Sequence, residues 1–413
     1  MLRGLSLSLV FLTLTACNGG GGSGTDGDDN LGSNNNAALQ QLNKDFVITK
    51  SYEPLVGIIT SIGLSPDGNK AIVATTDSGA PLTIVDLTLD KPAISSTIDV
   101  TELGFPSGTK PDVILSPDGN YAIFIPDSTG RVNFNGEYHR TDYFVIADTS
   151  SVFSNGDITP VGRIFGVNPL NYYSNDLTFL DSTTVAITWD EGDFSYTEFF
   201  SLDDLQVFDS EITDLSTKAY ERDDSVALSI FSELEQTNST KRRFVISSPW
   251  HFSYLYEIDD SANWSLIDAD NYRSLPYGMT SSALVTTLNN VLYDPYSKDG
   301  DSYFSKASIT ETSFDERQSV KIPTDIKTRP DHFIDYKDGK HIVMYGRDAS
   351  SNDALALFDT TTGTFIADTS FEGTIHGLLG SNYIHELMYP QIIDGKVFVG
   401  GQQGLNVYSL VDK

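Results

Sequence analysis

Two histidines in this sequence are candidates for acid–base chemistry, and one of them stands beside a carboxylate. His332 follows Asp331, and His251 follows Trp250. A histidine oriented by a carboxylate is a common general acid or base, because its pKa lies near neutral pH. Adjacency in sequence does not establish the geometry of such a pair, so His251 and His332 are only candidates and the catalytic residues are unknown at this stage.

Motifs for metal or phosphate chemistry are missing from the sequence. His385 and Glu386 begin like a zinc-protease motif, but Tyr389 occupies the position of the second histidine. His376 and His385 could share a metal, although their spacing is not that of a ligand pair and ordinary loop histidines are the simpler interpretation. We therefore expect no metal and no cofactor, and whether the chain is an enzyme stays uncertain, with a non-enzyme favoured.

Aromatic residues beside carboxylates and amides form the second group of candidates. Such faces suit contact with carbohydrate or peptide, although large aromatics also fill cores. Arg347 joins them because an arginine can neutralise a ligand carboxylate. The ligand-binding candidates are Tyr172, Tyr173, Trp189, Trp250 and Arg347.

Cys17, the sole cysteine, follows a segment with a basic start at Arg3, an apolar run over 5–14 and small residues. This is the layout of a secretory signal peptide. The sequence Leu-Thr-Ala-Cys at 14–17 resembles the lipobox of bacterial lipoproteins, and the resemblance implies cleavage before Cys17 and lipid on its thiol and new amino terminus. An ordinary signal peptide or an uncleaved anchor is the alternative, but the apolar run falls short of the roughly 20 residues of a membrane span.

The chain is expected to have three parts. Residues 1–16 form the signal peptide, 17–43 the lipidated cysteine and a flexible tether rich in Gly, Asp and Asn, and 44–413 the folded domain. A short helical turn could form at 37–42. Asn18 stands where lipoproteins retained in the inner membrane often carry Asp, so the resemblance implies sorting to the outer membrane, on an undetermined face.

Charge and cysteine content exclude several partners. The formal net charge is −31, with 26 basic and 57 acidic residues. A surface this acidic repels phosphate backbones, so nucleic acid is not expected as a partner. Because Cys17 is the only cysteine, no disulfide can form within the chain, and with Cys17 lipidated no thiol remains for catalysis.

Internal repeats indicate the fold. Leu-Ser-Pro-Asp-Gly-Asn occurs at 64–69 and again at 115–120, with strand-like runs on both sides, and weaker copies occur at 180–187, 336–344 and 393–399. Pro, Asp and Gly provide turn geometry, so each copy predicts a β-hairpin. Two further strands follow each hairpin, the first often ending in an acid.

Units of four antiparallel strands, each of roughly 40–50 residues, are typical of β-propeller blades. The sequence therefore predicts an all-β domain, a β-propeller of seven four-stranded blades in which residues 45–52 supply the outer strand of the last blade. A pair of β-sandwiches is the competing fold. The repeats at 64–73 and 115–124 resemble the YVTN and Tol-type propeller repeats of bacterial envelope proteins, a resemblance that supports fold and not chemistry.

Two functions fit these features. The first is a membrane-tethered lipoprotein propeller that binds or assembles an envelope protein or glycan. The alternative is a polysaccharide-active lyase or glycosidase on the same scaffold. A redox protein similar to quinone-cofactor propellers is the least supported alternative, because its cofactor residues are not recognisable.

Overall fold

The computed structural model describes residues 35–36, 38–54, 57–126, 131–134, 137–140, 143–165, 176–179, 181–191, 194–202, 211–212, 230–234, 241–248, 252–258, 264–271, 286–298, 300–371, 390–401 and 404–413. The chain divides into two compact units, residues 1–30 and 31–413, and the second is the subject here. Cys17, Tyr172, Tyr173, Trp250 and His251 lie outside the described residues. In the described part, no helix is long and apolar enough to cross a membrane.

The Ser-Pro-Asp-Gly segments form tight turns because their side chains supply the bonds that the backbone needs. The Ser65 hydroxyl donates to the Asp67 carboxylate at 2.6 Å, and the backbone N–H of Lys70 donates to Ser65 Oγ at 2.9 Å. The second copy repeats both bonds, at 2.7 and 2.9 Å. Gly68 has a φ of 64°, which glycine adopts without steric cost. The motif is therefore structural, as predicted.

Aspartates at the ends of third strands also serve the turns. Asp86 Oδ1 accepts a bond of 2.8 Å from the backbone N–H of Thr88. The same bond forms two residues after Asp148, at 2.9 Å, and after Asp359, at 2.8 Å. Such turns suit aspartate because its short side chain reaches the backbone two residues on. Part of the acidic excess is thus explained by turn geometry.

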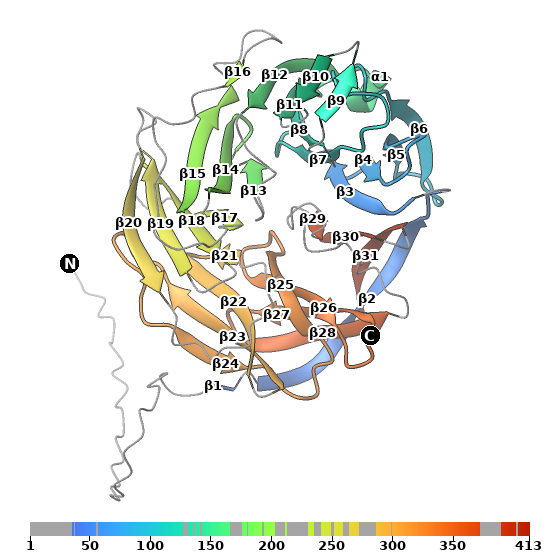
Figure 1. Ribbon diagram of the computed structural model, residues 1–413. Helices are drawn as coiled ribbons and strands as arrows, with labels where there is room; N and C mark the ends of the chain where they lie inside the picture. The colour runs from blue at the N-terminus through green and yellow to red at the C-terminus, as the bar shows by residue number, and fades with distance from the viewer. Residues whose placement is uncertain are drawn as a thin grey trace, which may run out of the picture. The chain divides into compact units, whose positions relative to one another are not determined.

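Four separate sheets contain four or five strands each (Figure 1). The first consists of β3 (Ile59–Leu64), β4 (Lys70–Thr75), β5 (Leu82–Asp86) and β6 (Ala93–Ile98). The second consists of β7 (Asp112–Leu115), β8 (Tyr121–Ile125), β11 (Tyr143–Asp148), β12 (Thr159–Phe165) and β16 (Glu211–Ile212). The third consists of β17 (Ile230–Glu233), β18 (Arg242–Ser248), β19 (Phe252–Ile258) and β20 (Trp264–Asn271). The fourth consists of β1 (Asn35–Asn36), β21 (Thr286–Leu288), β22 (Val291–Lys298), β23 (Asp301–Ser308) and β24 (Gln318–Lys321).

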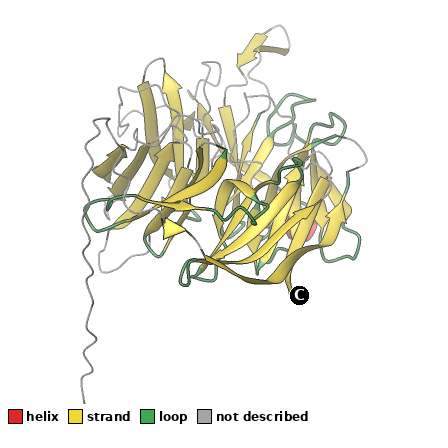
Figure 2. Ribbon diagram, turned by 90° about the horizontal axis from the view of Figure 1, so that it is seen from below, coloured by secondary structure: helices red, strands yellow, loops and turns green. Residues whose placement is uncertain are grey.

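The remaining strands form one large sheet and two small ones. Eight strands follow the order β25-β26-β27-β28-β2-β31-β30-β29. Their bounds are β25 (Arg329–Asp335), β26 (His341–Arg347), β27 (Asp353–Asp359), β28 (Thr364–Phe371), β2 (Ala38–Tyr52), β31 (Gly404–Asp412), β30 (Lys396–Gly401) and β29 (Gln391–Ile393). A three-stranded sheet contains β13 (Asp176–Phe179), β14 (Thr184–Glu191) and β15 (Phe194–Ser201), and a hairpin contains β9 (Arg131–Phe134) and β10 (Glu137–Arg140). The helix α1 (Val152–Asn155) is short, and strands and loops dominate the rest (Figure 2).

Hairpin turns that follow one another along the chain touch one another. The Asn289 side chain donates to the carbonyl of Gly339 at 3.0 Å, and the Tyr336 hydroxyl donates to the carbonyl of Gly395 at 2.9 Å. The turn at 65–69 touches the hairpins on both sides of it. A Cβ atom built on Gly68 would lie 3.3 Å from Ile393, and a Cβ atom built on Gly119 would lie 2.8 Å from Pro66. An ion pair between Arg242 and Asp181 joins two further sheets. The first hairpins of the sheets therefore gather at one end of the strands.

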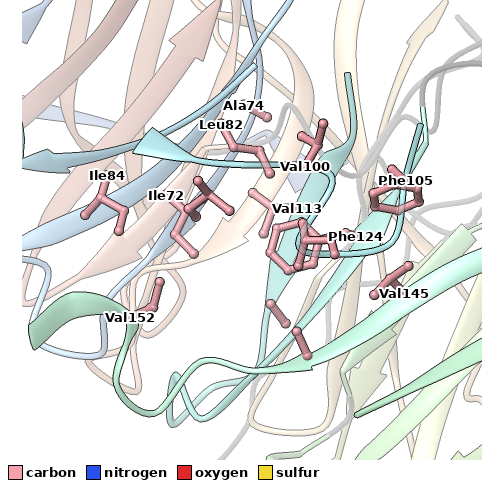
Figure 3. Close-up of a cluster of buried hydrophobic side chains, with 14 residues drawn as sticks. Ile72, Ala74, Leu82, Ile84, Val100, Phe105, Val113, Phe124, Val145 and Val152 are labelled. Carbon is pink, nitrogen blue, oxygen red and sulfur yellow. The ribbon is translucent and has the colours of Figure 1, made fainter. Parts of the chain in front are cut away.

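Apolar side chains fill the space between neighbouring sheets. Ile72 and Leu82 from the first sheet pack in one cluster with Val113 and Phe124 from the second (Figure 3). Each of these four side chains is fully or almost fully buried. Burying an aliphatic or aromatic side chain of this size contributes about 1.5–3 kcal/mol. Similar clusters lie between β25–β28 and β29–β31, and between β29–β31 and β3–β6.

The sheet pattern differs from seven separate four-stranded blades. Residues 44–52 of β2 pair antiparallel with β31, from Lys44 opposite Asp412 to Tyr52 opposite Leu405, as predicted for the closing strand. The start of β2 also pairs in parallel with β28, and this contact joins two four-stranded meanders into the eight-stranded sheet. The third unit retains three strands among the described residues.

The expectation of a flexible tether up to residue 43, with a helical turn at 37–42, is wrong for its last part. β1 pairs in parallel with β24, and the strand β2 begins at Ala38. Leu42 packs against the core cluster that contains Phe304 and Phe333. Strand pairing at open sheet edges and burial of Leu42 together outweigh the local helical preference.

Candidate functional site

Strand ends define two faces of the molecule. The hairpin turns, such as 65–69 and 336–340, lie at the ends that we call the turn face. The opposite ends, which we call the loop face, carry the connections 99–111, 322–328 and 348–352 and the hairpin of β9 and β10 among the described residues. Loops presented by a rigid scaffold are the usual place for binding residues, so the loop face is the first candidate for a site.

Two exposed arginines stand directly opposite each other on the loop face. Strand register pairs Arg329 at the start of β25 with Arg347 at the end of β26, and both side chains are exposed. Opposite residues of an antiparallel pair project to the same side of the sheet, with Cβ atoms about 4.5–5.5 Å apart. In the part of the chain that the structure describes, neither guanidinium has a hydrogen bond or ion pair.

A β-bulge sets the position of this arginine pair. The register of β25 and β26 shifts between Pro330 and His332, so Asp331 is the extra residue. Gly346 accommodates the bulge, because a Cβ there would lie 2.0 Å from the backbone oxygen of Arg329. Bulges re-aim side chains and occur often beside functional sites.

The connection from β26 to β27 is a tight turn that orders the next residues. The backbone N–H groups of Ser350 and Asn352 donate to Asp348 Oδ1 at 2.8 and 2.9 Å. The N–H of Asp348 donates to the carbonyl of Asn352 at 2.8 Å. The turn therefore fixes Arg347 on one side and Asp353, its cross-strand partner, on the other.

Buried polar groups lie beneath the arginines. Asp353 is 1% exposed and His332 is 8% exposed. The His332 ring lies 5.8 Å from the Tyr345 ring, centroid to centroid. Burial, with the charge of Asp353, raises the pKa of Tyr408 above its ordinary value, so Tyr408 remains a neutral hydroxyl at physiological pH.

These groups suit recognition of an anion. Arginine presents a planar fork of donors that matches a carboxylate, and two such forks lie side by side here. His332 is buried, so it does not project into solvent beside the two arginines. Among the described residues, no group of three or more His, Cys, Asp or Glu side chains could hold a metal ion.

Comparison with solved structures identifies the architecture. The WD40 domain of Toxoplasma gondii coronin matches with a TM-score of 0.53 and 10% identity, over 92% of this chain and 89% of that chain. Residues 31–413 have a β-propeller-like fold. Saccharomyces cerevisiae Sqt1 matches with a TM-score of 0.49 and 7% identity, over 89% of this chain and 100% of that chain. Citrobacter koseri AztD matches with a TM-score of 0.45 and 13% identity, over 86% of this chain and 89% of that chain.

Sequence comparison adds no family. No known family profile matches the sequence, and no curated protein matches it. The low identity to the coronin domain means that this likeness shows fold alone, so the function of the propeller must be argued from its site.

The propeller brings together two of the residues singled out from the sequence. His332 and Arg347 lie on neighbouring strands, and His332 is opposite Tyr345, two residues before Arg347. Trp189 lies on β14 opposite Tyr196, in a different sheet. Tyr172, Tyr173, Trp250 and His251 stay untested because they are outside the described residues.

Arg329 and Asp353 were missed at the sequence level. Each is unremarkable in its own segment, and only strand register places both beside Arg347. The repeat at 336–344 did contain a usable signal. Extending that hairpin to its outer ends pairs residues near 329 with residues near 347, which identifies Arg329 as the partner.

Proposed function

We propose that this chain is a lipid-anchored, seven-bladed propeller that binds an envelope protein or glycan through its loop face. The observation that carries this proposal is a pair of insertions on the loop face. They are the connection 99–111 and the hairpin of β9 and β10, which is inserted between β8 and β11. In repeat architectures, insertions concentrated on one face commonly mark the binding face.

The blade count of seven is supported by the hairpin turns. We count the eight-stranded sheet as two meanders and β13–β15 as one incomplete blade. Each of the seven blades then contains one first hairpin, with its turn at 65–69, 116–120, 180–183, 234–241, 289–290, 336–340 or 394–395. The pairing of β2 with β31 adds a fourth strand to the last meander, and apolar side chains of this meander pack against those of β3, β4 and β5, which supports closure of a ring between the last blade and the first.

Anchoring rests on the sequence around Cys17. A lipid there, followed by a glycine- and aspartate-rich segment, would tether the propeller to a membrane, and Asn18 favours the outer membrane. Binding fits this placement better than catalysis, because the buried His332 has no evident route to abstract a substrate proton.

A polysaccharide-active enzyme is the second candidate, and one observation favours it. His332 and Arg347 face the same side of their sheet, as a base and a carboxylate-neutralising group would in a lyase. Turnover of acidic glycans by the wild-type protein would make catalysis the proposed function in place of binding. The turnover should then be lost in His332→Ala and absent in a boiled sample.

Site-specific crosslinking tests the binding proposal. A photo-crosslinking amino acid at Ala349, an exposed loop-face position, should capture an envelope component, whereas the same group at Thr361, exposed on the turn face, should not. Equal capture from both positions, or none from Ala349 and other exposed loop-face positions, contradicts the proposal.

A further inference from the structure

The arginine pair is an unusual feature on this surface. Like charges directly opposite each other destabilise a strand pair, so Arg329 and Arg347 cost stability where they stand. Acidic residues outnumber basic ones 57 to 26, and several described cations pair with carboxylates of the chain itself. Lys44 pairs with Asp412 at 2.9 Å and Arg317 with Asp294 at 3.4 Å. An exposed pair left open on an acidic protein points to an anion from outside the chain.

We propose that Arg329 and Arg347 bind the carboxylate of an acidic sugar, a uronate, on the loop face of the propeller. This inference rests on the proposed binding function and names its ligand class. Arg329 and Arg347 would each donate through their guanidinium forks to the two carboxylate oxygens.

Local charge favours a single carboxylate. Asp348 follows Arg347 directly and Asp353 lies across the strand pair from it, so two carboxylates accompany the two guanidinium groups and the site carries little excess positive charge. A ligand with one negative charge suits such a site better than one with several. A polyanion or a doubly charged phosphate would leave excess negative charge beside Asp353, and the acidic surface would repel it further.

The surrounding groups favour a sugar over a peptide end. Asp348, Ser350, Asn352 and Ser370 lie around the turn after Arg347, and the Ser370 side chain interacts with Asp348. Hydroxyl, amide and carboxylate groups are the partners that sugar hydroxyls require. Among the described residues, the exposed large apolar side chains lie elsewhere: Val47, Ile48, Leu89, Ile94 and Val411. A peptide anchor would therefore find no apolar contact here.

Calorimetric titration of the full chain in detergent tests the proposal. The probes are D-glucuronate, neutral D-glucose, inorganic phosphate and N-acetyl-trialanine with a free carboxyl end. We expect glucuronate to bind at millimolar concentrations and glucose not to bind. Arg329→Gln and Arg347→Gln should each weaken glucuronate binding about ten- to hundredfold, which is the range for losing charge-assisted hydrogen bonds.

Matched variants make the outcome decisive. Lys337→Gln removes one exposed positive charge at the other end of the same hairpin and should leave binding unchanged. Arg347→Lys keeps the charge but loses the fork, so it should bind with intermediate affinity. No glucuronate binding, an equal loss in Lys337→Gln, or tighter binding of phosphate or of the peptide overturns the proposal. If crosslinking from Ala349 persists while glucuronate fails to bind, the binding function stands and only the acidic-sugar assignment falls.

Discussion

Gly346 is the residue on which the geometry of the arginine pair depends. A Cβ at this position would lie 2.0 Å from the Arg329 oxygen and 2.9 Å from the Pro330 Cα, both backbone atoms that cannot move aside cheaply. We expect Gly346→Ala to lower the free energy of unfolding by about 1–3 kcal/mol and to weaken glucuronate binding. Urea unfolding and titration would measure the two effects. Gly79→Ala is the matched control, because its nearest neighbour would be 3.5 Å away, and an equal effect there contradicts the prediction.

Asp67 shows how the acidic turns make stability depend on pH. The hydrogen bond from Ser65, with the backbone N–H of Asn69, lowers the pKa of Asp67 below its ordinary value. Because the folded pKa lies below the unfolded pKa of about 3.9, this carboxylate stabilises the fold above that pH, and the contribution is lost as the pH falls through the folded pKa.

Asp67→Asn should therefore be destabilising at pH 7 and nearly neutral once the pH is below the folded pKa of Asp67, where the wild-type carboxyl is protonated and uncharged. Urea unfolding of both proteins across this range would measure the closing gap. If the difference in the free energy of unfolding between the two proteins does not change with pH, the charge of Asp67 contributes nothing to stability. Only its role as a neutral hydrogen-bond acceptor would then matter.

At the scale of elements, the N-terminal arm is the feature that the sequence concealed. β1 and the start of β2 run along the outer edges of β24 and β28 before β2 joins β31 (Figure 1). The arm thus covers two strand edges that would otherwise be open to association. The N-terminal arm therefore pairs first with β24, and only afterwards supplies the closing strand beside β31.

Two matched deletions test this arm. Removing residues 35–43 should lower the free energy of unfolding by about 1–3 kcal/mol, because edge hydrogen bonds and the packing of Leu42 are lost. Removing residues 18–34, which the sequence predicts to be flexible, should leave stability unchanged. Chemical denaturation measures both, and equal stability of the two deletions would show that the arm contributes nothing.

Hairpins were predictable from sequence because their turn chemistry is local. Ser65 and Asp67 specify their turn through contacts within five residues, and the second copy does the same. Parallel pairing of β1 with β24 depends instead on which sheet edge is open in three dimensions, a property that no local pattern records.

The candidate site, like the strands, was predictable only where its residues could be recognised from local sequence. His332 and Arg347 were recognisable by residue type, whereas the contribution of Arg329 and Asp353 arises from register.

At the scale of the whole molecule, the formal charge of −31 bears on the proposed anchor. An acidic propeller is repelled by anionic headgroups, and repulsion of this kind acts over about 10 Å at moderate salt. The lipid proposed on Cys17 would hold the chain at a membrane against this repulsion.

Cys17→Ser tests the anchor directly. Because lipid attachment requires a thiol, the variant should lose all incorporation of labelled palmitate, whereas Asn18→Ala, which keeps the thiol, should retain the label. Mass spectrometry of the wild-type protein should find an N-terminal peptide that begins at Cys17 and carries acyl chains. The variant should keep the same unfolding transition as the wild type, because the tether after Cys17 contributes no predicted core contact. Label in the serine variant, or a wild-type chain that still begins at Met1, would show that the cysteine is not an anchor and that the acidic propeller reaches its partner without one.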